Sequence, residues 1–149
     1  MQPPLTPETL VAAYAAGCFP MADLDDQLGD GPGMVHWYAP DPRAIISLEG
    51  DAFHVPKSLA RTIRRGIFEL TTDTAFRQVM TECAVPRRGD PPGSGWISGE
   101  MIDAYTRLHK SGLAHSVEAL RTDDAKRRLV GGIYGVSLGA AFFAESMFC

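Results

Sequence analysis

The chain has 149 residues, of which 45% are hydrophobic and 21% charged, a balance typical of one globular domain or of a small domain joined to an incomplete larger one. No apolar run approaches the roughly 20 residues needed to span a bilayer, and residues 1–6 lack the basic and apolar regions of a signal peptide. We therefore expect a cytoplasmic location and no membrane partner. Charge is unevenly divided: residues 1–50 hold seven acidic residues and one basic residue, whereas residues 51–149 hold eleven acidic and thirteen basic. This asymmetry indicates surfaces of different sign.

The spacing of cysteine and histidine matches none of the common metal sites. The three cysteines are widely spaced and odd in number, so they form neither a CxxC pair nor a disulfide framework. The four histidines form no HExxH-type pair. We therefore expect no metal and no cofactor.

The first fifty residues predict a small N-terminal domain with one well-marked helix. Thr6 is a typical N-cap, Pro7 suits the first helical position, and Gly17 ends the helix. A domain boundary is expected near Gly50. Between the helix and this boundary we expect a polar loop at 23–33, a proline-bracketed turn at 37–43 and a short strand at 44–48.

The second domain, residues 51–149, is expected to open with helices and one short strand and to end with three strands. The helices are expected at 56–65, from the N-cap Asp73 to Pro86, and at 101–112, with a strand at 67–71 and a loop at 87–95. The later strands are expected at 115–120, 129–138 and 140–148, with the charged segment 121–128 as the first turn. Helices followed by a run of strands predict an α+β fold with an antiparallel meander.

The helix after Pro56 carries four cations on one face, at positions i, i+4, i+7 and i+8. They are Lys57, Arg61, Arg64 and Arg65. Such a stripe can contact the phosphates of a nucleic acid. A solvated outer face has the same pattern, and the pattern alone favours it.

Aromatic residues also stand in unusual places. Trp96 follows Gly93-Ser94-Gly95 in a loop, where it serves either as a stacking platform for a base or as an anchor that packs the loop on the domain. Trp37 and Tyr38 carry the same two readings, and the prolines around them favour a structural role.

Glu145 lies inside the apolar strand 141–148, on the same face as Phe143 and Met147 if the strand alternates regularly. Neither face is plainly polar, so we expect Glu145 to line a cavity. A buried carboxylate needs a partner, which is either a substrate amine or an internal cation. Three glycines at 131, 132 and 135 suggest a bulge or a close approach of another backbone or of a ligand, and packing glycines remain an alternative.

Eight motifs in the same order resemble one known family along almost the whole chain. They are AYAAGCFPM (13–21), HWYAPDPR (36–43), HVPKSLARTIRR (54–65), TDTAFRQVMTECA (72–84), GWI (95–97), AYTRLHKSGLAHSVE (104–118), LVGGIYGVSLG (129–139) and FFAESMF (142–148). By these motifs the chain resembles the bacterial leucyl/phenylalanyl-tRNA–protein transferases. Many members have tryptophan where this chain has Met21.

The resemblance implies a small N-terminal domain followed by a domain similar to the Gcn5-related acetyltransferases. It implies transfer of leucine or phenylalanine, with methionine as a further candidate, from aminoacyl-tRNA to an N-terminal Arg or Lys of a protein, marking it for degradation, and we expect a monomer. By analogy, Trp96 and Met21 flank the terminal adenosine, Phe142 and Ile133 line the amino-acid pocket, and Glu145 engages the acceptor amine. The cationic stripe contacts the tRNA. The family continues beyond residues 142–148, including an Asp-x-Gln segment of its active centre, so the second domain is expected to be incomplete at its C-terminal end.

Two other functions remain open. A catalytically impaired remnant of the family would bind tRNA without transferring an amino acid. A CoA-dependent N-acetyltransferase would need a pyrophosphate-binding loop that opens a helix after the central strands, and no such loop occurs in the sequence.

Overall fold

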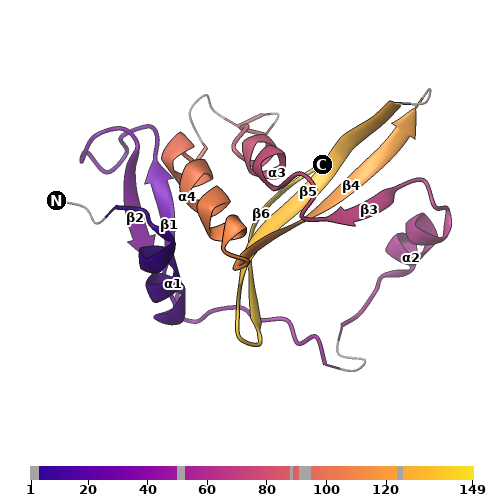
Figure 1. Cartoon of the computed structure of the whole chain (residues 1–149), viewed down its shortest axis with the longest axis horizontal. Helices are drawn as coiled ribbons and strands as arrows, with labels where there is room; N and C mark the ends of the chain where they lie inside the picture. Colours follow the sequence, from indigo (N-terminus) through magenta and orange to yellow (C-terminus); the bar gives the residue numbers. More distant parts are fainter. Residues whose placement is uncertain (1–3, 50–52, 88, 91–94, 124–125) are drawn as a thin grey trace.

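The computed structural model describes residues 4–49, 53–87, 89–90, 95–123 and 126–149. Within these residues, helices and strands form a mixed α+β structure, which confirms the predicted class (Figure 1). The elements are α1 (Pro7–Ala15), β1 (Phe19–Asp23), β2 (Met34–Tyr38), α2 (Lys57–Arg64), β3 (Glu69–Thr72), α3 (Phe76–Cys83), α4 (Gly99–Lys110), β4 (Ala114–Asp123), β5 (Lys126–Leu138) and β6 (Ala141–Phe148).

Strands β3 to β6 form a four-stranded sheet in the order β3-β4-β5-β6, and every neighbouring pair is antiparallel. The predicted meander is therefore confirmed. The predicted turn at 121–128 is wrong in extent, because Arg121 pairs with Arg128 and Thr122 with Arg127. Charged side chains do not end a strand when backbone pairing continues and alternate side chains reach solvent.

The N-terminal segment differs in part from the expectation. Helix α1 has the predicted N-cap: the Thr6 hydroxyl accepts a hydrogen bond from the Thr9 amide, completing a capping box. The β1–β2 hairpin was not predicted, because both strands are short and a long polar loop separates them. The predicted strand 44–48 is wrong. No described strand pairs with it, and Ile45 is 88% exposed, so its backbone has no ladder to join.

Asp73 is not the predicted N-cap. Helix α3 begins at Phe76 and has no side-chain cap on its N-cap residue. Asp73 has a left-handed backbone (φ 60°), and its carboxylate accepts hydrogen bonds from the Ser116 amide and from Nδ1 of His115, both at 2.8 Å. The start of the helix is capped by Glu118 instead. This residue is fully buried, and its carboxylate accepts hydrogen bonds from the amides of Thr74 (3.4 Å) and Ala75 (3.3 Å). A cap supplied from β4 has no local sequence signal.

One hydrophobic core joins the N-terminal segment to the larger sheet. Leu10 and Tyr14 of α1 pack in the same cluster as Met101, Tyr105 and the side chains of β5. Helices α3 and α4 cover one face of the sheet, with α1 beside α4 (Figure 1). The opposite face is called the open face below; it carries exposed apolar side chains in the described residues, namely Leu70, Val117, Phe142 and Met147. The division at Gly50 stays a prediction, because residues 50–52 lie outside the described residues.

Candidate functional site

Glu145 occupies a β-bulge on β6. Tyr134 pairs with Ser146 and Gly135 with Ala144, so that Glu145 has no partner on β5. A bulge bends the strand, shifts the alternation of its side chains and re-aims the extra residue, which is why bulges recur beside active sites. The predicted face of Phe143, Glu145 and Met147 is therefore wrong for Met147, which is 57% exposed and lies opposite Ile133.

Glu145 is partly buried on the helix-covered side of the sheet. Burial raises the pKa of its carboxyl to about 7, against the opposing effects of hydrogen bonding with Tyr14 and of the positive charge of Arg43. The Arg43 guanidinium lies 5.4 Å from the ring centroid of Phe19 and 5.3 Å from that of Phe143. A carboxyl with this pKa can both accept and release a proton near neutral pH.

Three buried tyrosines surround this carboxyl. The hydroxyls of Tyr14 and Tyr105 lie 2.6 Å apart, and the rings of Tyr105 and Tyr134 meet edge to face at 5.7 Å. Burial raises the pKa of all three phenols, so they stay neutral and can act as hydrogen-bond donors. The Tyr134 hydroxyl has no hydrogen-bond partner in the described structure. No local pattern in the sequence signalled this cluster, because its three tyrosines lie far apart in the chain, on α1, α4 and β5.

At two of the three glycines for which a bulge or a close approach was expected, Gly132 and Gly135, other chain segments pack closely against β5. A Cβ at Gly135 would lie 2.5 Å from Cζ of Phe142, whose ring covers this position on the open face. A Cβ at Gly132 would lie 2.9 Å from both Val79 and Phe148. Bulge and close approach are both present, so larger residues at 132 and 135 would force the strands apart.

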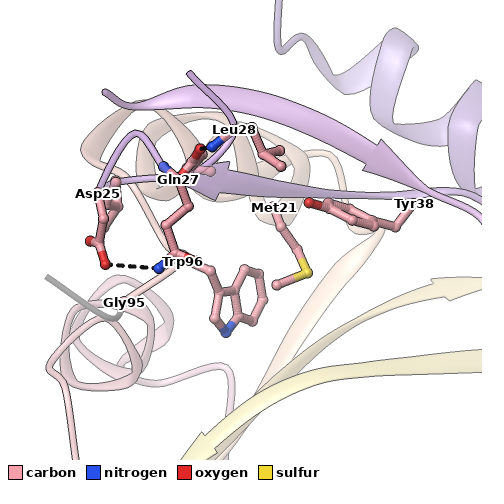
Figure 2. Close-up of a pocket in the computed structure, with 10 residues that line it drawn as sticks. Met21, Asp25, Gln27, Leu28, Tyr38, Gly95 and Trp96 are labelled. Atoms are coloured by element: carbon pink, nitrogen blue, oxygen red, sulfur yellow. Dashed lines mark hydrogen bonds between the residues drawn. The ribbon is translucent and has the colours of Figure 1, made fainter. Parts of the chain in front are cut away.

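A small cavity of about 210 Å³ lies between the β1–β2 hairpin and the loop before α4. The structure brings Met21 and Trp96 together there, and Figure 2 shows the indole beside the Met21 thioether. A hydrogen bond of 2.9 Å from the Ala22 amide to the Trp96 carbonyl ties the loop to β1. The rest of the wall consists of Ala22, Asp23, Leu24, Asp25, Gln27, Leu28, Tyr38 and Gly95.

The structure does not bring Phe142 and Ile133 to this cavity or to the buried side of Glu145. Phe142 is 45% exposed and pairs with Ser137, and Ile133 pairs with Val117 and Met147. Both side chains therefore contribute to the open face.

The four cations predicted on one helix face are all exposed. Lys57, Arg61 and Arg64 belong to α2 and Arg65 is its C-cap. No residue of α2 is buried, and the helix packs against no other described element. In Figure 1, α2 lies at the opposite end of the molecule from the β1–β2 hairpin. The sequence alone favoured a solvated face, and the tRNA contact stays a prediction.

Within the described residues, no three or more His, Cys, Asp and Glu side chains are grouped so that they could hold a metal ion. Among the helices of the described ranges, none is both long enough and apolar enough to cross a membrane.

The fold and site define an α+β protein with a partly buried acid among neutral phenols, and comparison with known proteins specifies the family. The model of the leucyl/phenylalanyl-tRNA protein transferase family matches residues 46–149, and the model of its N-terminal domain matches residues 4–41. Leucyl/phenylalanyl-tRNA–protein transferases are similar along the chain: that of Myxococcus xanthus is 51% identical over 145 residues, which are 97% of this chain and 56% of the relative. That of Anaeromyxobacter sp. (strain K) is 49% identical over 144 residues, with the same two coverages.

The similar protein of Akkermansia muciniphila is 48% identical over 144 residues, which are 97% of this chain and 67% of the relative. This chain therefore belongs to the leucyl/phenylalanyl-tRNA protein transferase family. It spans little more than half the length of the relatives from Myxococcus xanthus and Anaeromyxobacter sp. (strain K).

Proposed function

We propose that this chain carries the acid and the tRNA-binding face of an enzyme that transfers leucine or phenylalanine, with methionine as a further candidate, from aminoacyl-tRNA to a protein. The acceptor is an N-terminal Arg or Lys, and the product is marked for degradation. The transferase acts as a monomer in the cytoplasm. The observation that carries the proposal is Glu145 on its bulge, with a pKa of about 7 beside Tyr14 and Arg43.

The proposed reaction needs little from the protein, because an aminoacyl ester is already activated. The acceptor α-amine attacks the ester carbonyl, a C–N bond forms, and the C–O bond to the tRNA ribose breaks. Glu145 accepts the proton that the amine loses, and the departing ribose oxygen takes up a proton. With a pKa of about 7, Glu145 is about half deprotonated at neutral pH and is a competent base. The free α-amine, with an ordinary pKa near ~7.7–8.0, is itself partly neutral there.

Positioning is proposed to supply much of the remaining rate. The neutral phenol of Tyr14 hydrogen-bonds and orients the Glu145 carboxylate, and the Tyr105 hydroxyl, 2.6 Å from that of Tyr14, holds the Tyr14 phenol in place. Trp96 and Met21 flank the terminal adenosine, since the indole and the thioether share one cavity wall. Phe142 and Ile133 lie on the open face, away from Glu145 and from the Trp96 cavity, so we do not include them in the proposed amino-acid pocket.

The exposed cations of α2 are proposed to contact tRNA phosphates. Helix α2 carries no acidic residue, and four cations lie on one of its faces. Such a face attracts a polyanion whatever the nucleotide sequence of that polyanion is. The separation of α2 from the Trp96 cavity suits a partner as large as tRNA, whose end and body can be held at different places.

The test follows labelled leucine from Leu-tRNA onto a model protein with N-terminal Arg, comparing this chain with Glu145→Gln. Glu82→Gln, an exposed carboxylate on α3, is the matched control. We expect transfer to fall at least about 100-fold in Glu145→Gln, as for loss of a general base, and to be unchanged in Glu82→Gln. If the folded chain binds tRNA but neither it nor the control transfers leucine, the chain is the non-catalytic remnant instead. Retention of CoA on purification would support an acetyltransferase.

A further inference from the structure

A cavity of about 370 Å³ lies where the segment after α2 meets β4. It is called the Phe68 cavity below, and its walls are residues 66–69, which lead from α2 into β3, and Leu120, Arg121 and Thr122 of β4. Its volume falls within the range of small-molecule sites, ~300–1,000 Å³, so the cavity can hold one base with its ribose. In Figure 1, α2 and β3 lie on the side of the molecule away from the β1–β2 hairpin.

The apolar part of the wall is open to solvent. Phe68 is 38% exposed and Ile67 is 44% exposed. Gly66, with φ 60°, lets the chain turn at the end of α2, which is the usual role of a left-handed glycine at a helix C-terminus. Glu69 then pairs with Leu120, so the residue after Phe68 is already fixed to the sheet. An exposed phenyl ring beside a paired strand is a surface on which a base can stack.

Cations flank the Phe68 cavity on both sides. On one side, Arg65 is the C-cap of α2 and belongs to the four-cation face described above. On the other side, Arg121 of the wall pairs with Arg128 of β5. Residues 57–69 and 120–128 contain eight basic and three acidic residues, in a chain whose net charge is −4. The surroundings of this cavity therefore attract a polyanion.

The acidic residue of the wall, Glu69, is paired with a cation. Its carboxylate accepts a hydrogen bond from the guanidinium of Arg127 on β5. The negative charge of the wall is therefore offset by an adjacent positive charge, and a phosphate near the cavity meets a surface with an excess of cations.

An unpaired nucleotide is the occupant that matches both properties of this site. In a double helix the faces of the bases are stacked on one another, and an RNA helix presents mainly phosphates and ribose hydroxyls to a protein. In a loop or bulge the base is free to stack on an aromatic side chain, and its phosphates stay exposed. A cationic surface alone would suit either form of RNA, whereas an exposed ring between two groups of cations favours the second.

We propose that the Phe68 cavity receives one unpaired nucleotide from the body of an RNA. The base stacks on the phenyl ring of Phe68, and the phosphates on its two sides contact the cations of α2 and those of the β4–β5 ladder. This proposal rests on the proposed function, in which the RNA is a tRNA. It adds a base contact to a surface that otherwise meets only phosphates.

The measurement is a titration of the full chain, followed by fluorescence anisotropy, with two labelled RNA duplexes that differ only in a bulge of unpaired uridines. We expect the bulged duplex to bind about tenfold more tightly, as for the stacking of one base. Phe68→Leu keeps an apolar wall and removes the ring, so it should bring the two dissociation constants within about twofold. For the fully paired duplex, this variant should keep the slope of log affinity against log salt, because no phosphate contact is lost. An unchanged slope also shows that the variant is folded.

Phe53→Leu is the matched control, because Phe53 is 51% exposed and lies outside the cavity wall; it should leave the ratio of the two dissociation constants unchanged. Equal affinity of the unmodified chain for both duplexes would overturn the proposal, and so would a preference for the bulge that persists in Phe68→Leu. Polyglutamate that binds through Phe68 as tightly as the bulged RNA would assign the cavity to acidic peptides instead. None of these results involves an amino acid on the RNA, so the leucine-transfer assay tests the proposed function separately.

Discussion

Replacing Glu145 by Gln should make the protein more stable at alkaline pH and leave it nearly unchanged at acid pH. Burial raises the pKa of Glu145 from 4.5 to about 7, so the folded state binds a proton that the unfolded chain has lost between these values. The stabilisation that comes from this extra bound proton is therefore fully present below about pH 4.5 and is lost as the pH rises through 7. Gln mimics the protonated acid at every pH.

The magnitude follows from the size of the shift. About 1.4 kcal/mol corresponds to one pKa unit, so the displacement from 4.5 to about 7 corresponds to about 3.5 kcal/mol at most. Because Glu145 is only partly buried, we expect about 2 kcal/mol.

Urea unfolding of both proteins at several values between pH 4.5 and 8.5 measures the difference in free energy of unfolding, from which the titration of all other groups cancels. The difference should rise from near zero to about 2 kcal/mol in favour of Gln. Glu82→Gln, which removes an exposed carboxylate, should show a flat difference. A flat difference for Glu145→Gln as well would refute the claim that burial governs this carboxyl.

Three further outcomes are expected. Tyr14→Phe removes a hydrogen bond to the charged Glu145, so the pKa of Glu145 should rise by about one unit in a ¹³C carboxyl titration; an unchanged or lower pKa would contradict the arrangement. Met21→Trp should tighten adenosine binding about tenfold, because base–aromatic stacking contributes about 1–3 kcal/mol; unchanged affinity would place the base elsewhere. Changing Arg61 and Arg64 together to Gln should weaken tRNA binding and reduce the slope of log affinity against log salt by about two, measured by filter binding; an unchanged slope would mean that α2 faces solvent.

The elements that the sequence predicted well are those with local signals. The helix from Thr6 to Gly17 follows from its cap and its terminating glycine, and the cationic face of α2 follows from spacing alone. The three long strands follow from apolar runs broken by turns. In each case the determining interaction lies within a few residues, so a pattern in the chain records it.

The misplaced elements depend on partners far along the chain. Residues 44–48 have the composition of a strand, but in the described structure no neighbouring strand pairs with them. The start of α3 depends on Glu118, which lies more than forty residues from Thr74. A short motif cannot record such a contact.

The candidate site shows the same division. By itself the sequence determined the family, the presence of a carboxylate in an apolar strand, and the separation of acidic and basic halves. Only the tertiary structure decided that Glu145 lies on a bulge and that the phenols of Tyr14 and Tyr105 meet beside it, 91 residues apart in sequence. It also decided that acids rather than cations line the Trp96 cavity. The physical reason is that burial and electrostatic environment belong to the packed arrangement of distant segments, whereas residue type and spacing belong to the chain.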